Sequence, residues 1–406
     1  MGSGVEMDEF ERSAVAFLDG VATRRSSRTA AWGEGSDRVG LFQEKTAEEE
    51  RTEVAAARAW RRQVFDAGFG WLTGPADYGG RALPVEYERC WQAVVAGYDV
   101  PATAVLAIGL GMVAPTLLAH GTETAKHRYL RALYRGDIIA CQLFSEPGAG
   151  SDLASLATRA ERDGDVWIVN GQKVWTSGAQ FSDIGEIICR TDPSVAKHKG
   201  LTGFLVDMRA SGVEVRPLRQ MTGGASFNEV FFTDVVIPDD HRLGDVNAGW
   251  GVALTTLMNE RAAIGGGAAG GASFGVGRLI ALLQHLDRAD EPLLRQQLAD
   301  IWIGVHVARV TNLRAMAKLA AGQMPGPELS IAKLALTQNL QRVSGFLSSA
   351  LGARLIADTG EWGTYAWAEL VLGVPGFRVA GGTDEVLRNI IGERVLGLPK
   401  EPRGGS

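Results

Sequence analysis

The sequence predicts an α+β protein made of a helical, a β and a second helical segment in that order. Two observations carry this prediction. Apolar residues recur every three or four positions up to about residue 138 and again after 246, as in amphipathic helices. Between 139 and 245 the period falls to two, which is typical of half-buried strands. We expect an N-terminal helical domain (1–138), a middle β domain (139–245), a C-terminal helical domain (246–398) and a tail (399–406).

Composition excludes several classes of protein. With 406 residues and 46% apolar content, the chain can bury a large core. A net charge of −6 without a basic run argues against nucleic-acid binding. No apolar run approaches the roughly 20 residues that span a bilayer. The scattered histidines lack metal-ligand spacing, so no metal is expected. The isolated cysteines Cys90, Cys141 and Cys189 indicate reduced thiols in a cytoplasmic protein.

Helices and strands follow from the same periodicities. In the first segment, helices are expected at 7–24, 47–67, 84–96, 103–120 and 124–134. Gly121 predicts a helix stop, followed by an N-cap in the threonines after it. In the middle segment, strands are expected at 184–190, 202–207, 213–217 and 230–238. The last segment predicts long helices at 300–319 and 328–356, and a disordered tail at 401–406.

Two stretches of the middle segment are candidates for a ligand site. The stretch from Gln142 to Asp152 predicts a strand that enters a tight loop. Gly148 and Gly150 would let backbone N–H groups approach an anionic or heteroatom-rich ligand, such as phosphate or flavin. The hydroxyls of Ser145 and Ser151 add donors there. An ordinary loop of a β domain is the alternative.

The second stretch predicts a β-hairpin. Residues 166–169 and 172–175 flank Asn170-Gly171, a pair that suits a two-residue turn. Trp175 and Ser177 are two positions apart and would share one side of a strand.

Together, the runs SEPGAGSD (145–152) and NGQKVWTSG (170–178) resemble the paired signature of the acyl-CoA dehydrogenase family. The resemblance resumes at AGGTDEVLRNIIGERVLG (380–397) and covers nearly the whole chain. It implies a middle β-barrel or sandwich, a C-terminal four-helix bundle and bound FAD. It also implies roles for flavin-binding residues, which are Gln142, Phe144, Ser145, Ser151, Trp175, Ser177, Thr383 and Glu385.

The resemblance assigns these residues to parts of the ligand. Ser145 and Ser177 would hydrogen-bond the isoalloxazine ring, and Trp175 would cover one of its faces. The backbone from Gln142 through Phe144 to Ser145 would line the other side. Ser151 would lie near the flavin phosphate or the pantetheine arm of the substrate, and Thr383 and Glu385 near the phosphate and ribose.

The catalytic base is expected at an alternative position. Many relatives have a Glu where this chain has Gly381, which cannot accept a proton but retains a backbone N–H for the thioester carbonyl. Some relatives use the Glu of a Leu-x-x-Glu-Arg run, which here makes Glu260 the candidate. On a helix, Glu260 would share a face with Leu257 and Ile264, and apolar surroundings raise a carboxyl pKa. A helix-edge salt bridge is the alternative. Arg261 matches an Arg that lies near the substrate and the base in the family. The alternative is that Arg261 forms a structural pair with an opposite charge.

Two departures from the family concern its oligomers. The Arg-x-x-Phe-Gly and Gln-x-x-Gly-Gly-x-Gly runs, which reach a neighbouring subunit's FAD in many relatives, are absent from 287–297 and 347–360. Arg295 is the candidate substitute. Similar departures occur in actinobacterial members with bulky substrates, some of which are mixed oligomers. A homo-oligomer (dimer or tetramer) or a heteromer is therefore expected.

The leading expectation is an FAD-dependent acyl-CoA dehydrogenase of lipid metabolism, reoxidised by an electron-transfer flavoprotein. Three alternatives remain: a dehydrogenase of an acyl group bound to a carrier protein, a flavin oxidase or monooxygenase, and a non-catalytic partner subunit. The small-residue run at 262–277 indicates either dense helix packing or a roomy acyl cavity.

Overall fold

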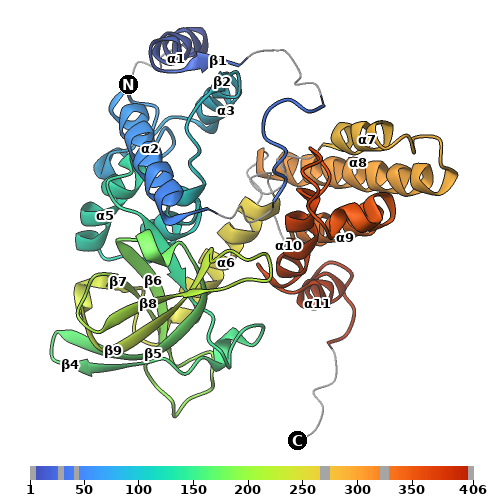
Figure 1. The fold of residues 1–406 in the computed structure, drawn as a ribbon. Coiled ribbons are helices and arrows are strands. Elements are labelled where there is room, and N and C mark those ends of the chain that lie inside the picture. The colour runs from blue at the N-terminus through green and yellow to red at the C-terminus, as the bar shows by residue number, and fades with distance from the viewer. Residues whose placement is uncertain (1–5, 26–31, 41–44, 266–274, 321–328, 401–406) are drawn as a thin grey trace, which may run out of the picture. The chain divides into compact units, whose positions relative to one another are not determined.

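The computed structural model describes residues 6–25, 32–40, 45–265, 275–320 and 329–400. The chain divides into two compact units (Figure 1). The first comprises residues 1–29, 45–219 and 225–256, and the second comprises 30–44, 220–224 and 257–406. In the described part of the chain, no helix has both the length and the apolar character needed to cross a membrane.

The first unit contains the helices of the N-terminal segment, and side-chain caps mark the start of two of them. The helices are α1 (Met7–Val21), α2 (Ala47–Asp66), α3 (Val85–Val95), α4 (Ala114–His120) and α5 (Glu123–Arg135). Thr46 and Glu49 form a reciprocal capping box at the start of α2. Thr122 caps α5 by accepting a hydrogen bond from the N–H of Ala125, so this helix begins one residue earlier than expected.

The helix expected at 103–120 is interrupted. A 3-10 turn at Ala104–Leu106 and a π-helical turn at Gly109–Val113 precede α4. Pro115 has no N–H to donate within a regular helix, and glycine lowers helix stability. The backbone also packs closely at Gly109, where an added Cβ would lie 3.3 Å from the nitrogen of Ala140.

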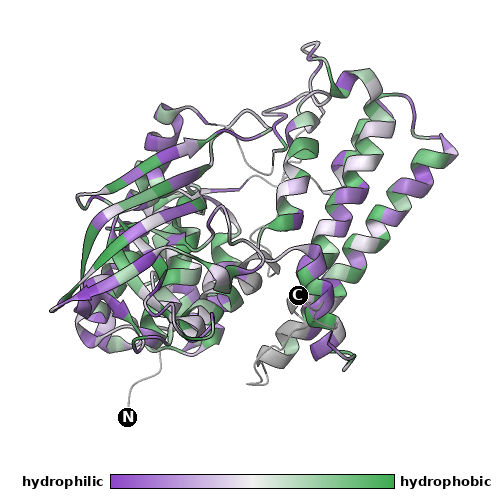
Figure 2. Ribbon diagram, turned by 90° about the horizontal axis from the view of Figure 1, so that it is seen from below, coloured by the Kyte–Doolittle hydropathy of each residue, from purple (hydrophilic) through white to green (hydrophobic). Residues whose placement is uncertain are grey.

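The middle segment forms one mixed eight-stranded sheet in the order β10-β7-β6-β4-β5-β9-β8, with β3 paired to β6. Its strands are β3 (Ala140–Leu143), β4 (Arg159–Asp163), β5 (Val166–Ser177), β6 (Ile184–Arg190), β7 (Leu201–Asp207), β8 (Val213–Leu218), β9 (Phe227–Pro238) and β10 (Arg242–Leu243). A separate pair, β1 (Thr23–Arg24) with β2 (Tyr98–Asp99), lies among the helices of this unit. Hydrophilic and hydrophobic bands alternate along the strands (Figure 2), as the period of two predicts.

The predicted Asn170-Gly171 hairpin is wrong. Residues 166–177 form one continuous strand, β5, which pairs with both β4 and β9. Asn170 and Gly171 lie at a register shift between β5 and β9, where the Asn170 side chain bonds Asp234. The hairpin turn is instead between β4 and β5, at Gly164. Asn-Gly suits a bulge as well as a turn, and pairing on both sides of β5 decides between them.

The second unit contains the remaining helices. These helices, which make up most of the C-terminal segment, are α7 (Val276–His285), α8 (Pro292–Ala320), α9 (Leu329–Leu351), α10 (Trp367–Val379) and α11 (Asp384–Arg394). Helix α6 (Gly249–Gly265) crosses the boundary between the units. Helix α8 begins eight positions before the predicted start, at Pro292, a residue suited to a first helical turn. Of the small-residue run at 262–277, residues 266–274 lie outside the described part, as does the tail at 401–406.

Candidate active site

The first candidate stretch forms the predicted strand and tight loop. Strand β3 places Gln142, after which Phe144 is buried and Ser145 is half-buried. Two backbone hydrogen bonds of 3.0 Å between Glu146 and Ala149 close the loop. An added Cβ at Gly148 or Gly150 would meet no atom within 4 Å, so a ligand could approach this backbone closely.

The second stretch lies directly beside the first. The N–H of Val174 donates to the carbonyl oxygen of Ser145 at 2.8 Å. Lys173 Nζ donates to the carbonyl oxygen of Phe144 at 3.0 Å. Two segments that are far apart in the sequence therefore lie side by side, with Ser145 bonded directly to Val174, the residue before Trp175.

A buried ion pair holds these two segments together. Lys173 Nζ lies 2.8 Å from Glu146 Oε1, and the two side chains are only 0% and 7% exposed. Glu146 also accepts hydrogen bonds from the N–H groups of Ala157 (2.6 Å) and Thr158 (2.9 Å). Burial alone would raise the pKa of Glu146, but Lys173 and these donors lower it below its ordinary value. This pair was not predicted from the sequence, although the two motifs carry opposite charges at these positions.

Trp175 presents its ring to solvent. It is 60% exposed, and its ring packs edge-on against Phe227 at 5.9 Å. Its φ of +62° is rare for a bulky residue and coincides with a register shift between Lys173 and Thr176. Thr176 is buried, whereas Trp175 is exposed and Ser177 is half-buried. An exposed indole beside hydroxyls can cover a flat aromatic ligand.

The remaining residue of the loop, Ser151, is exposed. Its neighbour Asp152 pairs with Lys197 at 2.6 Å, also at the surface. Ser151 can therefore contact a ligand that extends along the outside of the loop.

The predicted residues of the second unit lie on two elements. Gly381 (φ +67°) and Gly382 (φ +95°) form the turn between α10 and α11. Thr383 caps α11 by accepting a hydrogen bond from the N–H of Val386 at 3.1 Å. Glu385 is exposed in the first turn and lies 3.5 Å from Arg388. These residues form a tight turn onto a helix N-terminus, a geometry that suits phosphate.

Helix α6 carries the candidate base. Glu260 is half-buried on it, as is Leu257 one turn earlier. Arg261 is in the same helix, but the side chains of Arg261 and Ile264 are outside the described part. Arg295 is largely exposed, and it donates to the carbonyl oxygen of Ala289 at 3.3 Å.

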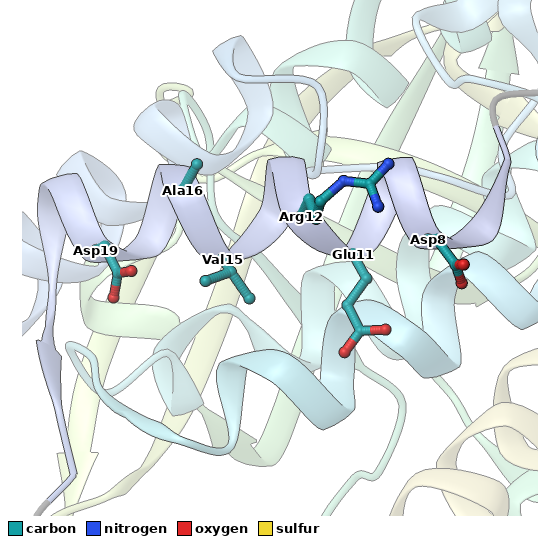
Figure 3. Close-up of a pocket in the computed structure, with 6 residues that line it drawn as sticks. All are labelled: Asp8, Glu11, Arg12, Val15, Ala16 and Asp19. Carbon is teal, nitrogen blue, oxygen red and sulfur yellow. The ribbon is translucent and has the colours of Figure 1, made fainter.

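A surface hollow elsewhere does not coincide with these residues. It follows one face of α1 and is lined by Asp8, Glu11, Arg12, Val15, Ala16 and Asp19 (Figure 3). Asp19 is already bonded to Arg24 and to the hydroxyl of Tyr98. Among the residues with described positions, no cluster of three or more His, Cys, Asp or Glu side chains could hold a metal ion.

Family models identify the class of protein to which this fold belongs. The N-terminal, middle and C-terminal domains of acyl-CoA dehydrogenases match residues 40–137, 141–235 and 247–396. The chain belongs to the acyl-CoA dehydrogenase family and is an oxidoreductase. Members of this family bind FAD.

Two curated relatives are from Mycobacterium tuberculosis. The chain is 38% identical to acyl-CoA dehydrogenase IpdE1, over 86% of this chain and 89% of that protein. It is 40% identical to acyl-CoA dehydrogenase FadE34 over 86% of this chain, and it spans about half (47%) of that protein's length.

Two solved structures share the fold. One is described as the Tcur3481-Tcur3483 steroid ACAD (TM-score 0.74, 26% identity, 98% of this chain and 99% of that one). The other is the ChsE4-ChsE5 complex from Mycobacterium tuberculosis (TM-score 0.69, 26% identity, 99% of this chain and 100% of that one). The predicted family and its order of helical, β and helical domains are thus confirmed.

Proposed function

We propose that this chain binds FAD and uses it to remove the α and β hydrogens of an acyl-CoA thioester. The observation that supports the proposal most is the backbone hydrogen bond from Val174 to Ser145, which joins two motifs that contain an exposed indole, two half-buried hydroxyls and an open glycine loop. Bound flavin would supply the hydride acceptor for the β hydrogen.

Different residues would contact different parts of the cofactor. Ser145 and Ser177 offer hydroxyls to the ring system, and Trp175 offers a flat apolar face. The backbone of Gln142 to Phe144 would line the other side of the ring. Ser151, Thr383 and Glu385 would contact the polar part of FAD, and Ser151 and Arg261 the CoA substrate.

We assign the proton-transfer step to Glu260. Its carboxylate would accept the α proton of the thioester, and the Gly381 N–H would donate a hydrogen bond to the carbonyl oxygen, where negative charge develops. Glu260 is half-buried, one helical turn after the half-buried Leu257, and this partial shielding from water supports the assignment. A glycine at 381 keeps the backbone N–H that would donate to the thioester carbonyl, and it adds no second carboxylate.

The experiment is anaerobic titration of the purified yellow protein with acyl-CoA thioesters. We expect Glu260→Gln to retain flavin and lose bleaching by at least about 10²-fold in rate. Asp300→Asn, an exposed carboxylate on α8, is the matched control and should bleach normally. Normal bleaching by Glu260→Gln would refute the base assignment. A wild-type protein that binds no flavin, alone or with a related chain, would refute the cofactor assignment.

The acyl group that we favour is bulky. One structural relative is described as a steroid ACAD, and this supports testing ring-containing and branched acyl-CoAs beside straight chains. Electron-transfer flavoprotein is the proposed electron acceptor. Rapid reoxidation of the reduced protein by oxygen would instead favour an oxidase.

We also propose that the chain functions as an oligomer, through α8. On this helix Trp302, Ile303, Val307, Val310 and Leu313 are each more than half exposed. Ile303, Val307 and Val310 follow helical spacing and share a face. A continuous apolar face of this kind is typical of a subunit interface. The partner is a second copy or, as in the ChsE4-ChsE5 complex, a related chain.

A further inference from the structure

The turn that would present the Gly381 N–H has no side chains of its own to fix it. Gly381 and Gly382 are consecutive glycines, both in the left-handed region of φ. Two adjacent glycines populate many backbone conformations, so a single conformation has to be imposed from outside the turn. The amide of Gly381 can act as an electrostatic donor only if its direction is set before the substrate arrives.

A buried lysine from another helix supplies that constraint. Lys333, on α9, is only 1% exposed along its side chain. Its Nζ donates to the carbonyl oxygen of Gly382 at 2.8 Å and lies 3.4 Å from the carbonyl oxygen of Arg378 at the end of α10. On the other side of the turn, the N–H of Ala380 bonds the carbonyl oxygen of Gly376 at 3.0 Å. The peptide unit that enters the turn, between residues 379 and 380, and the one that leaves it, between residues 382 and 383, are therefore both held.

The charge of Lys333 is balanced within the same cluster. Asp384 Oδ1 lies 3.4 Å from Lys333 Nζ and accepts a hydrogen bond from Thr337 Oγ1 at 2.8 Å. Asp384 Oδ2 accepts a hydrogen bond from Arg378 Nε at 2.9 Å. Burial alone would raise the pKa of Asp384, but Arg378, Thr337 and Lys333 together lower it, so the carboxylate stays ionised. A paired charge lets Lys333 remain in the interior.

We propose that Lys333 is a positioning residue for the reaction: its ammonium group fixes the Gly381–Gly382 turn so that the Gly381 N–H is preorganised for the thioester carbonyl. This inference rests on the proposed function. Asp384 balances the charge of Lys333 and does not itself hold a carbonyl of the turn.

The test compares two variants that share the Asp384→Asn change and differ only in the side chain at position 333. Asp384→Asn removes the negative charge and leaves Lys333 in contact with Gly382. Lys333→Met/Asp384→Asn also removes the donor, without leaving a buried charge unpaired. Lys333→Gln/Asp384→Asn restores a shorter donor. Arg388→Gln, which disrupts only an exposed pair with Glu385, is the surface control.

The first readout is hydrogen exchange in flavin-free protein, because it needs no activity. Peptides that cover 380–386 should exchange about tenfold faster in Lys333→Met/Asp384→Asn than in Asp384→Asn, with partial recovery in the Gln variant. The control should match the wild type. Equal exchange in the Asp384→Asn and Lys333→Met/Asp384→Asn proteins would overturn the inference. If the Met variant does not fold, the exchange rates of Lys333→Gln/Asp384→Asn and Asp384→Asn are compared instead. Equal rates in these two proteins would likewise overturn the inference.

The second readout is the ionisation of bound acetoacetyl-CoA, whose enolate is stabilised by donors to its carbonyl. We expect the pH midpoint of enolate formation to rise by about one unit, and turnover to fall by about tenfold to hundredfold, on removal of the lysine donor. A purely structural role would leave the midpoint unchanged and would overturn the inference. Wild-type protein that neither binds acetoacetyl-CoA nor is bleached by acyl-CoA would refute the proposed function, whereas exchange would still report on the turn.

Discussion

Lys173 Nζ lies 2.8 Å from Glu146 Oε1, inside the protein and between the two motifs that identify the family. The pair connects the loop after β3 to β5, and Lys173 also donates to the carbonyl of Phe144. Neither side chain is available to a cofactor, because both are buried. Their contacts hold together the backbone segments that carry Ser145 and Trp175.

Loss of either charge from this pair should destabilise the fold. We expect Glu146→Gln or Lys173→Met to lower the free energy of unfolding by about 3–5 kcal/mol, because the remaining charge is buried without its partner. Chemical denaturation of flavin-free protein measures this. The exposed pair of Glu214 and Arg216 on β8 offers a control, since Glu214→Gln should change little. A double variant, Glu146→Gln/Lys173→Met, that is no more stable than the single variants would contradict the explanation.

Gly171 tests the correction of the predicted hairpin. An added Cβ there would lie 2.4 Å from Thr158 Oγ1 and 2.7 Å from its Cα, so backbone would have to move. Gly171→Ala should therefore cost about 1–3 kcal/mol of stability, as overpacking does. Gly148→Ala, where a Cβ meets nothing within 4 Å, should leave stability unchanged and weaken flavin binding. Equal stability of the two variants, measured by thermal unfolding, would contradict the close approach at Gly171.

Trp175 should matter for the cofactor and not for the fold. The ring of Trp175 is mainly exposed and packs edge-on against Phe227. Trp175→Ala should therefore leave the unfolding midpoint of flavin-free protein nearly unchanged. Loss of a stacking face should weaken FAD binding by about tenfold, consistent with about 0.5–1.5 kcal/mol for an aromatic pair. Titration of the apoprotein with FAD measures the affinity. Trp175→Phe is the matched control and should recover most of it.

Glu186 gives the first unit a specific pH dependence. This carboxyl, on β6, is fully buried and accepts a hydrogen bond from Thr256 at 2.6 Å. Burial raises its pKa to about 8, with Thr256 acting in the opposite direction. Between about pH 4.5 and about pH 8 the folded state keeps a proton that the unfolded state releases, so stability falls as pH rises, by about 1.4 kcal/mol per pH unit.

Glu186→Gln should remove that slope. The variant should gain stability relative to wild type as pH rises through this window, in denaturation curves at about pH 5.5 and about pH 8. Glu229→Gln, at a half-buried position on β9 of the same sheet, is the matched control substitution. Parallel pH profiles of Glu186→Gln and wild type would contradict a protonated Glu186 in the folded protein.

The apolar face of α8 predicts an effect on assembly. A charge at Val307 would be buried in a subunit interface and should dissociate it, so Val307→Glu should sediment at a lower mass than wild type. Val236→Glu, at an exposed position on β9, should not change the mass. A mixture with a related chain distinguishes the two partners: a homo-oligomer forms without it, whereas a heteromer requires it. A wild-type protein that stays monomeric in both cases would refute the proposed interface.

The sequence by itself determined the family, the order of helical and β segments, and most strands. Strand β6 matches the predicted 184–190, because its hydrophobic period is local information. The motif residues from Gln142 to Ser177 were also recognisable, because a ligand surface needs particular residue types at fixed spacing. The roles of these residues, of Glu260 and of Gly381 remain predictions.

Only the tertiary structure decided features that depend on residues distant in sequence. Asn170-Gly171 has the composition of a hairpin turn, but pairing of β5 with both β4 and β9 makes it a bulge. The partner of Lys173 is 27 positions away, and that of Lys333 is 51 positions away. A lysine in an apolar stretch predicts burial or a solvated edge equally well. The choice is fixed by which carboxylate and which carbonyls the fold brings to it, since a buried charge is stable only when it is paired.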